Sequence, residues 1–330
     1  MRRALDAVRR DVRAHALWPR GARIVLACSG GLDSLVALEL LVRLQRSLGH
    51  TLAVAHVDHG VHSGSEKAVA LVEETARTHG LAFASRTLRV PPGADLEGRA
   101  RTLRYQTLDE LRLELHGELL ATAHHADDQA ETLLMRAARG GGLEALAGIR
   151  RAREGAVVRP LLGLDRSWLL VCGERLGLTP HQDPTNADLD FCRNRLRHEV
   201  LPTLEAAIPG AARGLARTAG LLSDHTGALD GWIERALGGD LRLSREDGTL
   251  TAWLPRSAVP PDPRLQAGLL QYVCRKVGVA APTRRATDQV MVWAVGPMTS
   301  PCSIHGLTID IDGDGWRFRT SGIARQGCAD

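Results

Sequence analysis

Residues 29–34, Ser-Gly-Gly-Leu-Asp-Ser, have the residue types of a loop that holds phosphate. They follow an apolar run and precede a Leu-rich pattern of helical period. The glycines therefore lie where backbone N–H groups at the beginning of a helix can bind an anion. The stretch lacks the Gly-Lys-Ser/Thr ending of a Walker A loop and the GxGxxG dinucleotide fingerprint. The candidate nucleotide-binding residues are Ser29, Gly30, Gly31, Leu32, Asp33 and Ser34.

Asp33 places a negative charge in this loop, where a bound polyphosphate would repel it. A divalent cation between the two would remove the repulsion, because Mg²⁺ binds one or two carboxylates together with phosphate oxygens. The simpler alternative is an aspartate that complements the dipole at the beginning of a helix. We interpret the loop as a Mg-nucleotide site.

A second candidate site lies in the segment "TAHHADDQAET", residues 122–132. If a helix begins near His124, then His124, Asp128 and Glu131 share one of its faces. His124 and Asp128 could contact a phosphate, bind a metal or transfer a proton, and Asp128 is a second candidate Mg²⁺ ligand beside Asp33. A zinc site that also used His125 and Asp127 is disfavoured, because adjacent histidines point apart and no cysteine is near. An ordinary acidic helix start is the other alternative.

Basic residues are almost all arginines, since only two of the 42 lysines and arginines, Lys67 and Lys276, are lysines. A coding bias explains this composition, and a surface suited to bidentate phosphate contacts is compatible with it. Arg104 is a candidate phosphate contact that could stabilise charge developing on a reacting phosphate. The candidate RNA or phosphate contacts are Arg136, Arg139, Arg193, Asn194, Arg195 and Arg197. The last four cannot all share one face of a helix, so some of them are expected to serve structure.

The elements that must position these residues alternate between strand and helix. Strands are predicted at 24–28, 51–58, 81–88, 118–125 and 156–162, with helices at 33–48, 65–79, 96–115 and 126–139. This alternation predicts a parallel sheet with helices on both faces. The polar stretches 29–34, 56–59 and 124–128 follow carboxyl ends of strands, where open parallel sheets bind their ligands.

The fold class is therefore α/β: a parallel-sheet nucleotide-binding domain, a helical segment and a smaller α+β C-terminal domain. The predicted divisions are 1–210, 211–237 and 238–330. The first twenty residues are Arg-rich but have the spacing of a docked helix, which we favour over a targeting peptide. No apolar run is long enough for a membrane span, and the six cysteines include no CxxC pair. Reduced thiols in a cytoplasmic protein fit this composition.

Several motifs resemble one family, the bacterial tRNA(Ile)-lysidine synthetases, which belong to the PP-loop ATP pyrophosphatases. The loop 29–34 matches the superfamily motif SGGxDS, and the other blocks follow in the family's order. They are "VDHGVHSGSEKAV" (57–69), "DLEGRARTLRY" (95–105), "TAHHADDQAETLLMRAARGGGLEAL" (122–146), "RPLL" (159–162) and "DPTNADLDFCRNRLRHEVLP" (183–202). The length is similar to the family's short form. One departure is Val61-His62, where the family usually has Leu-Arg.

This resemblance implies a PP-loop fold and a two-step reaction that uses ATP and Mg²⁺. The C2 oxygen of the wobble cytidine in the CAU anticodon of tRNA(Ile) attacks the α-phosphate of ATP, and free L-lysine then displaces AMP to form lysidine. The implied catalytic residues are Asp33, Arg104, His124 and Asp128. They lie in the ATP-binding domain 1–210, and the C-terminal domain 238–330 is expected to bind the tRNA, which is far larger than one nucleotide-binding domain.

Two other functions remain as alternatives: another PP-loop tRNA-modifying enzyme such as a thiolase, and a non-enzymatic tRNA-binding protein. Thiolation would call for paired cysteines, whereas Cys28 reads as a buried strand residue. The intact Asp33 argues against a protein without catalysis. The expected partners are the tRNA, lysine and, as one arrangement, a second copy in a homodimer.

Overall fold

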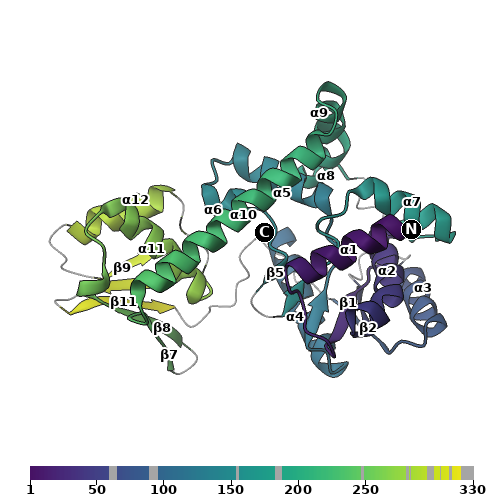
Figure 1. Ribbon diagram of the computed structural model, residues 1–330, viewed down its shortest axis with the longest axis horizontal. Coiled ribbons are helices and arrows are strands. Elements are labelled where there is room, and N and C mark those ends of the chain that lie inside the picture. The colour runs from purple at the N-terminus through teal and green to yellow at the C-terminus, as the bar shows by residue number, and fades with distance from the viewer. Residues whose placement is uncertain are drawn as a thin grey trace. The chain divides into compact units, whose positions relative to one another are not determined.

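The computed structural model describes residues 1–58, 65–88, 96–153, 156–182, 188–246, 249–279, 282, 284–295, 301–304, 306–311 and 314–320 (Figure 1). Val61 and His62, where the sequence differs from the Leu-Arg usual in the resembled family, lie outside these residues. The chain divides into two compact units. The first contains Met1–Met135 and Gly148–Ala219, and the second contains Arg136–Ala147 and Gly220–Asp330. None of the described helices combines the length and apolar character needed to cross a membrane.

The first unit is built on a six-stranded sheet of order β3-β2-β1-β4-β6-β5. Its strands are β1 (Arg23–Ala27), β2 (Thr51–Asp58), β3 (Phe83–Thr87), β4 (Leu119–Ala121), β5 (Ala152–Arg153) and β6 (Val157–Val158). All neighbouring pairs are parallel except β5 with β6. This confirms the predicted α/β class. The short antiparallel β5 at the sheet's edge was not predicted from the sequence.

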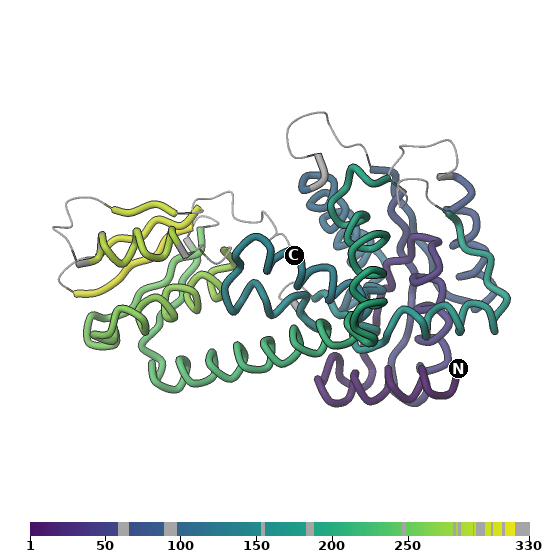
Figure 2. Tube along the Cα trace, turned by 90° about the horizontal axis from the view of Figure 1, so that it is seen from above, coloured from purple at the N-terminus to yellow at the C-terminus, as the bar shows by residue number. Residues whose placement is uncertain are grey.

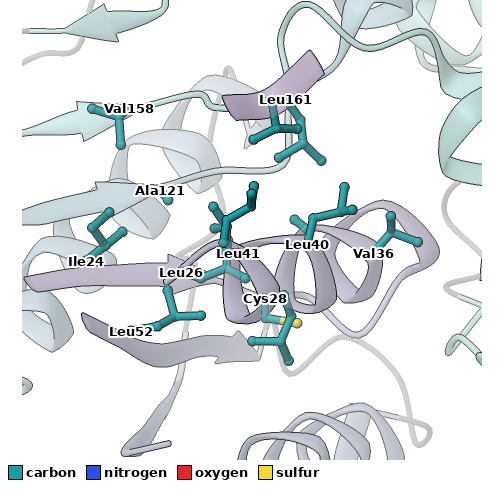
Figure 3. Packing of buried hydrophobic residues seen from close by; sticks show 14 of the residues in the cluster. Ile24, Leu26, Cys28, Val36, Leu40, Leu41, Leu52, Ala121, Val158 and Leu161 are labelled. Carbon is teal, nitrogen blue, oxygen red and sulfur yellow. The ribbon is translucent and has the colours of Figure 1, made fainter. Parts of the chain in front are cut away.

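Helices cover both faces of this sheet. They are α1 (Arg2–Ala14), α2 (Leu32–Leu48), α3 (Ser65–Thr78), α4 (Leu96–Glu114), α5 (Ala126–Ala138) and α7 (Arg166–Leu176). In β1, Ile24 and Leu26 join a core with α1, α2, α3 and α7, whereas Val25 joins a second core with α4. Figure 3 shows Ile24 and Leu26 beside Leu40 and Leu41 of α2. Successive strand residues point to opposite faces, so a strand buried on both sides is continuously apolar.

The amino-terminal helix docks as its sequence pattern predicts. Ala4, Val8 and Val12 of α1 are buried, and α1 lies against α2 (Figure 2). After α7, the chain forms α8 (Cys192–Arg195), one π-helical turn η2 (Leu196–Val200), α9 (Leu201–Ala207) and the long α10 (Ala211–Leu237).

Two strand predictions in the first unit were too long. The strand predicted at 118–125 ends at Ala121, and the strand predicted at 156–162 is the two-residue β6. Helix α5 begins at Ala126, so His124 lies in the connection before it and not on the helical face that carries Asp128 and Glu131. The Thr122 N–H still donates to the Val158 carbonyl at 3.0 Å, and the residues after it lie in the connection to α5.

The second unit is an antiparallel sheet covered on one face by helices, as the α+β prediction requires. The sheet has the order β7-β8-β11-β10-β9. Its strands are β7 (Arg242–Glu246), β8 (Thr249–Pro255), β9 (Cys302–Ile304), β10 (Leu307–Ile311) and β11 (Gly315–Thr320), and the 3-10 turn η3 spans Arg256–Ala258. Its core combines β8, β10 and β11 with α11 (Pro263–Lys276) and α12 (Arg284–Val295).

The short helix α6 (Leu143–Leu146) belongs to this second unit although it follows α5 in the chain. Arg275 on α11 donates hydrogen bonds to Glu144 on α6 and to Asp230 on α10. The chain thus leaves the first unit within α5, returns at Gly148 and leaves again within α10. The functional division at 210 and 237 stays a prediction.

Candidate active site

The loop after β1 is shaped by its own side chains and by one distant backbone group. Gly30 has φ +82°, a left-handed conformation that favours glycine. The Ser34 hydroxyl donates to the Gly31 carbonyl at 2.9 Å and accepts from the Ser29 N–H at 3.2 Å. The His181 N–H donates to the Gly30 carbonyl at 2.9 Å. The first N–H groups of α2, beginning at Leu32, lack helical partners and are available for an anion.

Asp33 lies opposite a buried histidine that the sequence did not single out as a site residue. Nε2 of His125 is 3.5 Å from Oδ2 of Asp33 and 3.5 Å from Oδ2 of Asp128, and its Nδ1 is 3.9 Å from Oδ1 of Asp127. The His125 side chain is 1% exposed. Within the described part of the chain, neither of its ring nitrogens has a hydrogen-bond partner. His125 thus lies between Asp33 of the Ser29–Ser34 loop and the carboxylates of Asp127 and Asp128 on α5.

The carboxylates and the imidazole shift one another's pKa values. Burial lowers the pKa of His125, but Asp128, Asp33 and Asp127 outweigh it and raise that pKa above its ordinary value. Burial raises the pKa of Asp128, but the charges of His125 and Arg193 hold it well below its usual range. The raised pKa of His125 favours its charged form, and the lowered pKa of Asp128 favours the carboxylate.

Asp128 and Glu131 form a buried ionic cluster with two arginines of the "RNRLRH" segment. Arg193 donates from Nε to Glu131 at 2.7 Å and from Nη2 to Asp128 at 2.9 Å. Arg197 makes the same two contacts at 2.7 Å and 2.9 Å. The Glu131 side chain is 1% exposed. We call Asp128, Glu131, Arg193 and Arg197 the ionic quartet, in which two carboxylates balance two guanidinium groups.

Asn194 and Arg195, the other two predicted contacts in this segment, bind backbone. The Asn194 amide donates to the Asp188 carbonyl at 2.8 Å, and Arg195 donates to the carbonyls of Leu189 and Asp190 at 2.5 and 3.1 Å. The expectation that some of the four serve structure is therefore correct. The π-helical turn η2 starts directly after them, a feature that is frequent at functional sites.

His124 lies beside the ionic quartet and is uncharged. Its Nδ1 is 2.8 Å from the Thr122 hydroxyl. Burial and the nearby Arg159 and Arg193 lower the pKa of His124 to about 3, although Asp128 opposes the shift. At neutral pH this imidazole can therefore form hydrogen bonds to a substrate but contributes no positive charge.

The remaining predicted residues are more scattered. Arg104 is partly buried on α4. Arg136 and Arg139 lie at the end of α5 and just after it, and Arg136 donates to the Ala145 carbonyl at 2.9 Å. Arg139 is exposed. The sequence also did not single out Arg159, a fully buried arginine that donates to the Arg150 carbonyl at 2.6 Å. The available signal was its position directly after β6, and for His125 it was a position four residues after the end of β4.

The donor set can be tested against a metal. Oδ1 of Asp33 is buried and has no hydrogen-bond partner among the described residues, which fits a ligand atom for a hard cation. Asp128 instead accepts hydrogen bonds from the side chains of Arg193 and Arg197 and from the backbone N–H of His125. In the described residues, no group of three or more His, Cys, Asp or Glu side chains is arranged to hold a metal. The zinc alternative gains no support there.

Comparisons with known proteins identify the family of this chain. The family model of the PP-loop domain matches residues 6–204. A tRNA(Ile)-lysidine synthase of Novosphingobium aromaticivorans is 36% identical over 309 residues, which cover 92% of this chain and 90% of that relative. The chain belongs to the tRNA(Ile)-lysidine synthase family. A family member from Geobacter sulfurreducens is 39% identical over 257 residues, 74% of this chain.

Family members differ in length relative to this chain. The matched part spans 54% of the Geobacter sulfurreducens relative and 64% of a relative from Azoarcus sp., which is 35% identical. Among solved structures, a U34-tRNA thiolase from Methanococcus maripaludis has a TM-score of 0.57 at 19% identity. That match covers 68% of this chain and 80% of the thiolase, and it shows a shared fold.

Proposed function

We propose that this chain is an ATP-dependent ligase that converts the wobble cytidine of the CAU-anticodon tRNA(Ile) to lysidine. In the first step the C2 oxygen of the cytidine attacks the α-phosphate of ATP, and pyrophosphate leaves. In the second step the ε-amine of free L-lysine attacks C2, and AMP leaves. The observation that carries the proposal is the Ser29–Ser34 loop, with Asp33 and Asp128 both facing His125 at one sheet edge. The tRNA(Ile)-lysidine synthases among its relatives support it.

The loop residues bind the leaving part of ATP in this proposal. The glycines at positions 30 and 31 admit a phosphate close to the backbone, and the beginning of α2 supplies N–H donors. The loop contains no lysine, so the positive charge that balances the phosphates of ATP must come from other residues or from the metal ion. Arg104 is assigned to the α-phosphate, where an always-charged guanidinium stabilises the negative charge that develops during attack.

Mg²⁺ fits the carboxylate of Asp33, whose Oδ1 atom is buried without a partner. When bound, the ion would neutralise charge on the phosphates of ATP. Asp128 is the second candidate ligand, but both of its oxygens already accept hydrogen bonds. We therefore assign Asp33 as the main metal ligand. Asp128 acts mainly on the arginines and on His125.

His124 is assigned to hydrogen bonding with the reacting base or the α-phosphate. A group with a pKa of about 3 is a weak base near neutral pH, so removal of the amine proton by His124 would be inefficient. A neutral imidazole held by Thr122 can still orient a substrate.

The predicted RNA contacts separate into two sets. Arg193 and Arg197 are held in the ionic quartet, and their assigned role is to keep Asp128 and Glu131 charged and fixed. Arg136 and Arg139, in the segment that belongs to the second unit, are assigned to the tRNA backbone. Cytoplasmic location and a homodimer remain predictions.

Incubation of the protein with ATP, labelled lysine and a panel of tRNA transcripts tests the proposal. The expected products are AMP, pyrophosphate and lysidine in the CAU-anticodon tRNA(Ile) alone. Without lysine, the tRNA should accumulate in adenylated form. Ornithine should complete the second step poorly, because a chain one methylene shorter misplaces the amine. Incorporation of sulfur from a sulfur donor, with none of lysine, would make the chain a thiolase.

A further inference from the structure

The sheet of the second unit has one face that the helices do not cover. In β8, Ala252 and Leu254 are buried in the apolar core shared with α11, and Trp253 between them points to the opposite side. In β11, Phe318 is buried in the same core, whereas Arg317 is exposed. Alternation along each strand therefore separates an apolar inner face from a polar outer face.

One row of this outer face places a tryptophan between two arginines. The register sets Arg242 of β7 and Arg317 of β11 directly opposite Trp253, one on each neighbouring strand. Asp310 of β10 lies opposite Arg317 on its other side, so the row carries two arginines and one carboxylate. The guanidinium carbon of Arg242 lies 5.0 Å from the centroid of the Trp253 ring. This distance is that of a cation–π contact, and the stacked pair presents a planar cationic surface.

The next row, two residues along the strands, is rich in hydroxyl groups. Ser244, Thr251, Arg319 and Thr308 are successive cross-strand neighbours. The hydroxyls of Ser244 and Thr251 are 2.5 Å apart. Arg319 is 49% exposed, and its nearest acidic partner, Asp310, is 3.8 Å away. A pair at this distance on an exposed surface leaves the guanidinium able to contact a ligand.

We propose that this outer face binds the RNA of the substrate, an inference that rests on the proposed function. We define the basic sheet face as Arg242, Ser244, Thr251, Trp253, Arg317 and Arg319. Arginines and hydroxyls are the usual donors to phosphate and sugar oxygens. An aromatic ring or guanidinium plane is a surface on which unpaired bases stack. An acidic protein segment would use the arginines but would leave the hydroxyl row and the planar stack without a role.

The test measures binding of a CAU-anticodon tRNA(Ile) transcript to the full-length protein between 50 and 200 mM salt. The variant is Arg317→Ala/Arg319→Ala. The matched control is Arg245→Ala, which removes an exposed arginine from β7 on the other side of the sheet. We expect the double variant to bind at least about tenfold more weakly, with a salt slope smaller by about two, since each lost phosphate contact reduces the slope by about 0.9. The control should stay within about twofold of the wild type.

Trp253→Leu tests the stacking contribution separately, and thermal unfolding of each variant checks that it is folded. A loss of at least about fivefold is expected for this variant, because base stacking contributes about 1–3 kcal/mol per base. Equal losses in the double variant and in Arg245→Ala would overturn the proposal, and so would an unchanged affinity and slope in the double variant. Polyglutamate that binds the wild type as tightly as tRNA, with the same sensitivity to the substitutions, would assign the face to acidic proteins.

Failure of the proposed function gives a different pattern. Lysine incorporation by the wild type is measured in parallel with tRNA binding. If no lysine is incorporated while the double variant still binds tRNA more weakly than Arg245→Ala does, the ligase assignment falls and the RNA-binding face stands. If lysine is incorporated and the variants bind alike, the enzyme assignment stands and the basic sheet face is excluded.

Discussion

The two units differ in how deeply they bury their carboxylates and imidazoles. In the first unit, charged groups lie buried beyond the carboxyl edge of the sheet, and both Glu131 and His125 are 1% exposed. In the second unit, the described buried residues are apolar apart from three threonines and the phenol of Tyr272. Its arginines on the sheet, such as Arg317 and Arg319, are exposed.

The difference shows what each arrangement is suited for. A buried charge costs several kcal/mol of desolvation and persists only where partners hold it in one geometry. Such a group is preorganised for chemistry on a small reacting centre. An exposed charge costs little and is screened by salt, so it serves association with a large charged partner.

Substitution Asp33→Asn should reduce pyrophosphate release by at least about a thousandfold, because the loop loses its metal-binding charge. Affinity for tRNA should change by less than about threefold, since the basic residues assigned to RNA are untouched. Steady-state pyrophosphate assays and tRNA binding measure the two effects. Near-normal turnover at saturating Mg²⁺ would rule out the role assigned to Asp33.

Substitution Glu131→Gln should lower the free energy of unfolding by roughly 3–5 kcal/mol, because it leaves Arg193 and Arg197 partly buried with one carboxylate between them. The comparison variant is Glu144→Gln in the second unit, where Arg275 keeps its contact with Asp230. We expect a smaller loss there, about 1 kcal/mol. Urea denaturation at pH 7 measures both. Equal losses would remove the distinction between the two units.

Acidification should destabilise the first unit through His50. Burial lowers the pKa of this histidine to about 4 from 6.5, so the unfolded chain takes up a proton at a higher pH than the folded chain does. The stability that His50 contributes is therefore complete above pH 6.5 and is lost as the pH falls towards 4. The loss at pH 4 is about 2–3 kcal/mol. Denaturation at several pH values should show a flatter dependence for His50→Leu, and an unchanged slope would contradict this assignment.

Substitution Arg319→Ala should have the smallest effect on stability, below about 0.5 kcal/mol, because its pair with Asp310 is exposed and 3.8 Å long. Thermal unfolding with the wild type in parallel measures it. A loss above 1 kcal/mol would indicate that the outer sheet face has a structural role.

The local pattern of the sequence accounts for most of the first unit's fold. Apolar runs and helical periods predicted β1, β2, α2 and α5 to within one or two residues at their ends. Each of these elements is long enough for burial on one or both sides to produce a clear pattern of apolar residues in the sequence. The short strands β4, β5 and β6 carried too few residues for such a signal.

The loop of the site was also readable from the sequence, because Ser29 to Ser34 are adjacent in the chain and their chemistry is local. The α/β architecture, the loop proposed to bind phosphate and the charged residues at strand ends therefore follow from the sequence alone. The partners of those charges came only from the tertiary structure. Arg193 lies 62 positions after Glu131 in the sequence, and the two form an ion pair. Asp33 and His125 follow β1 and β4, which are separated in the sequence but adjacent in the sheet.

No period or spacing in the sequence encodes such pairs, since they depend on how separate elements pack. For the same reason Arg193 and Arg197, which have the composition of an RNA-binding segment, proved to be internal counter-charges to Asp128 and Glu131. The cause is burial, because a carboxylate removed from water is stable only beside a cation or hydrogen-bond donors of the protein. For Asp128 and Glu131, these two guanidinium groups are the cations.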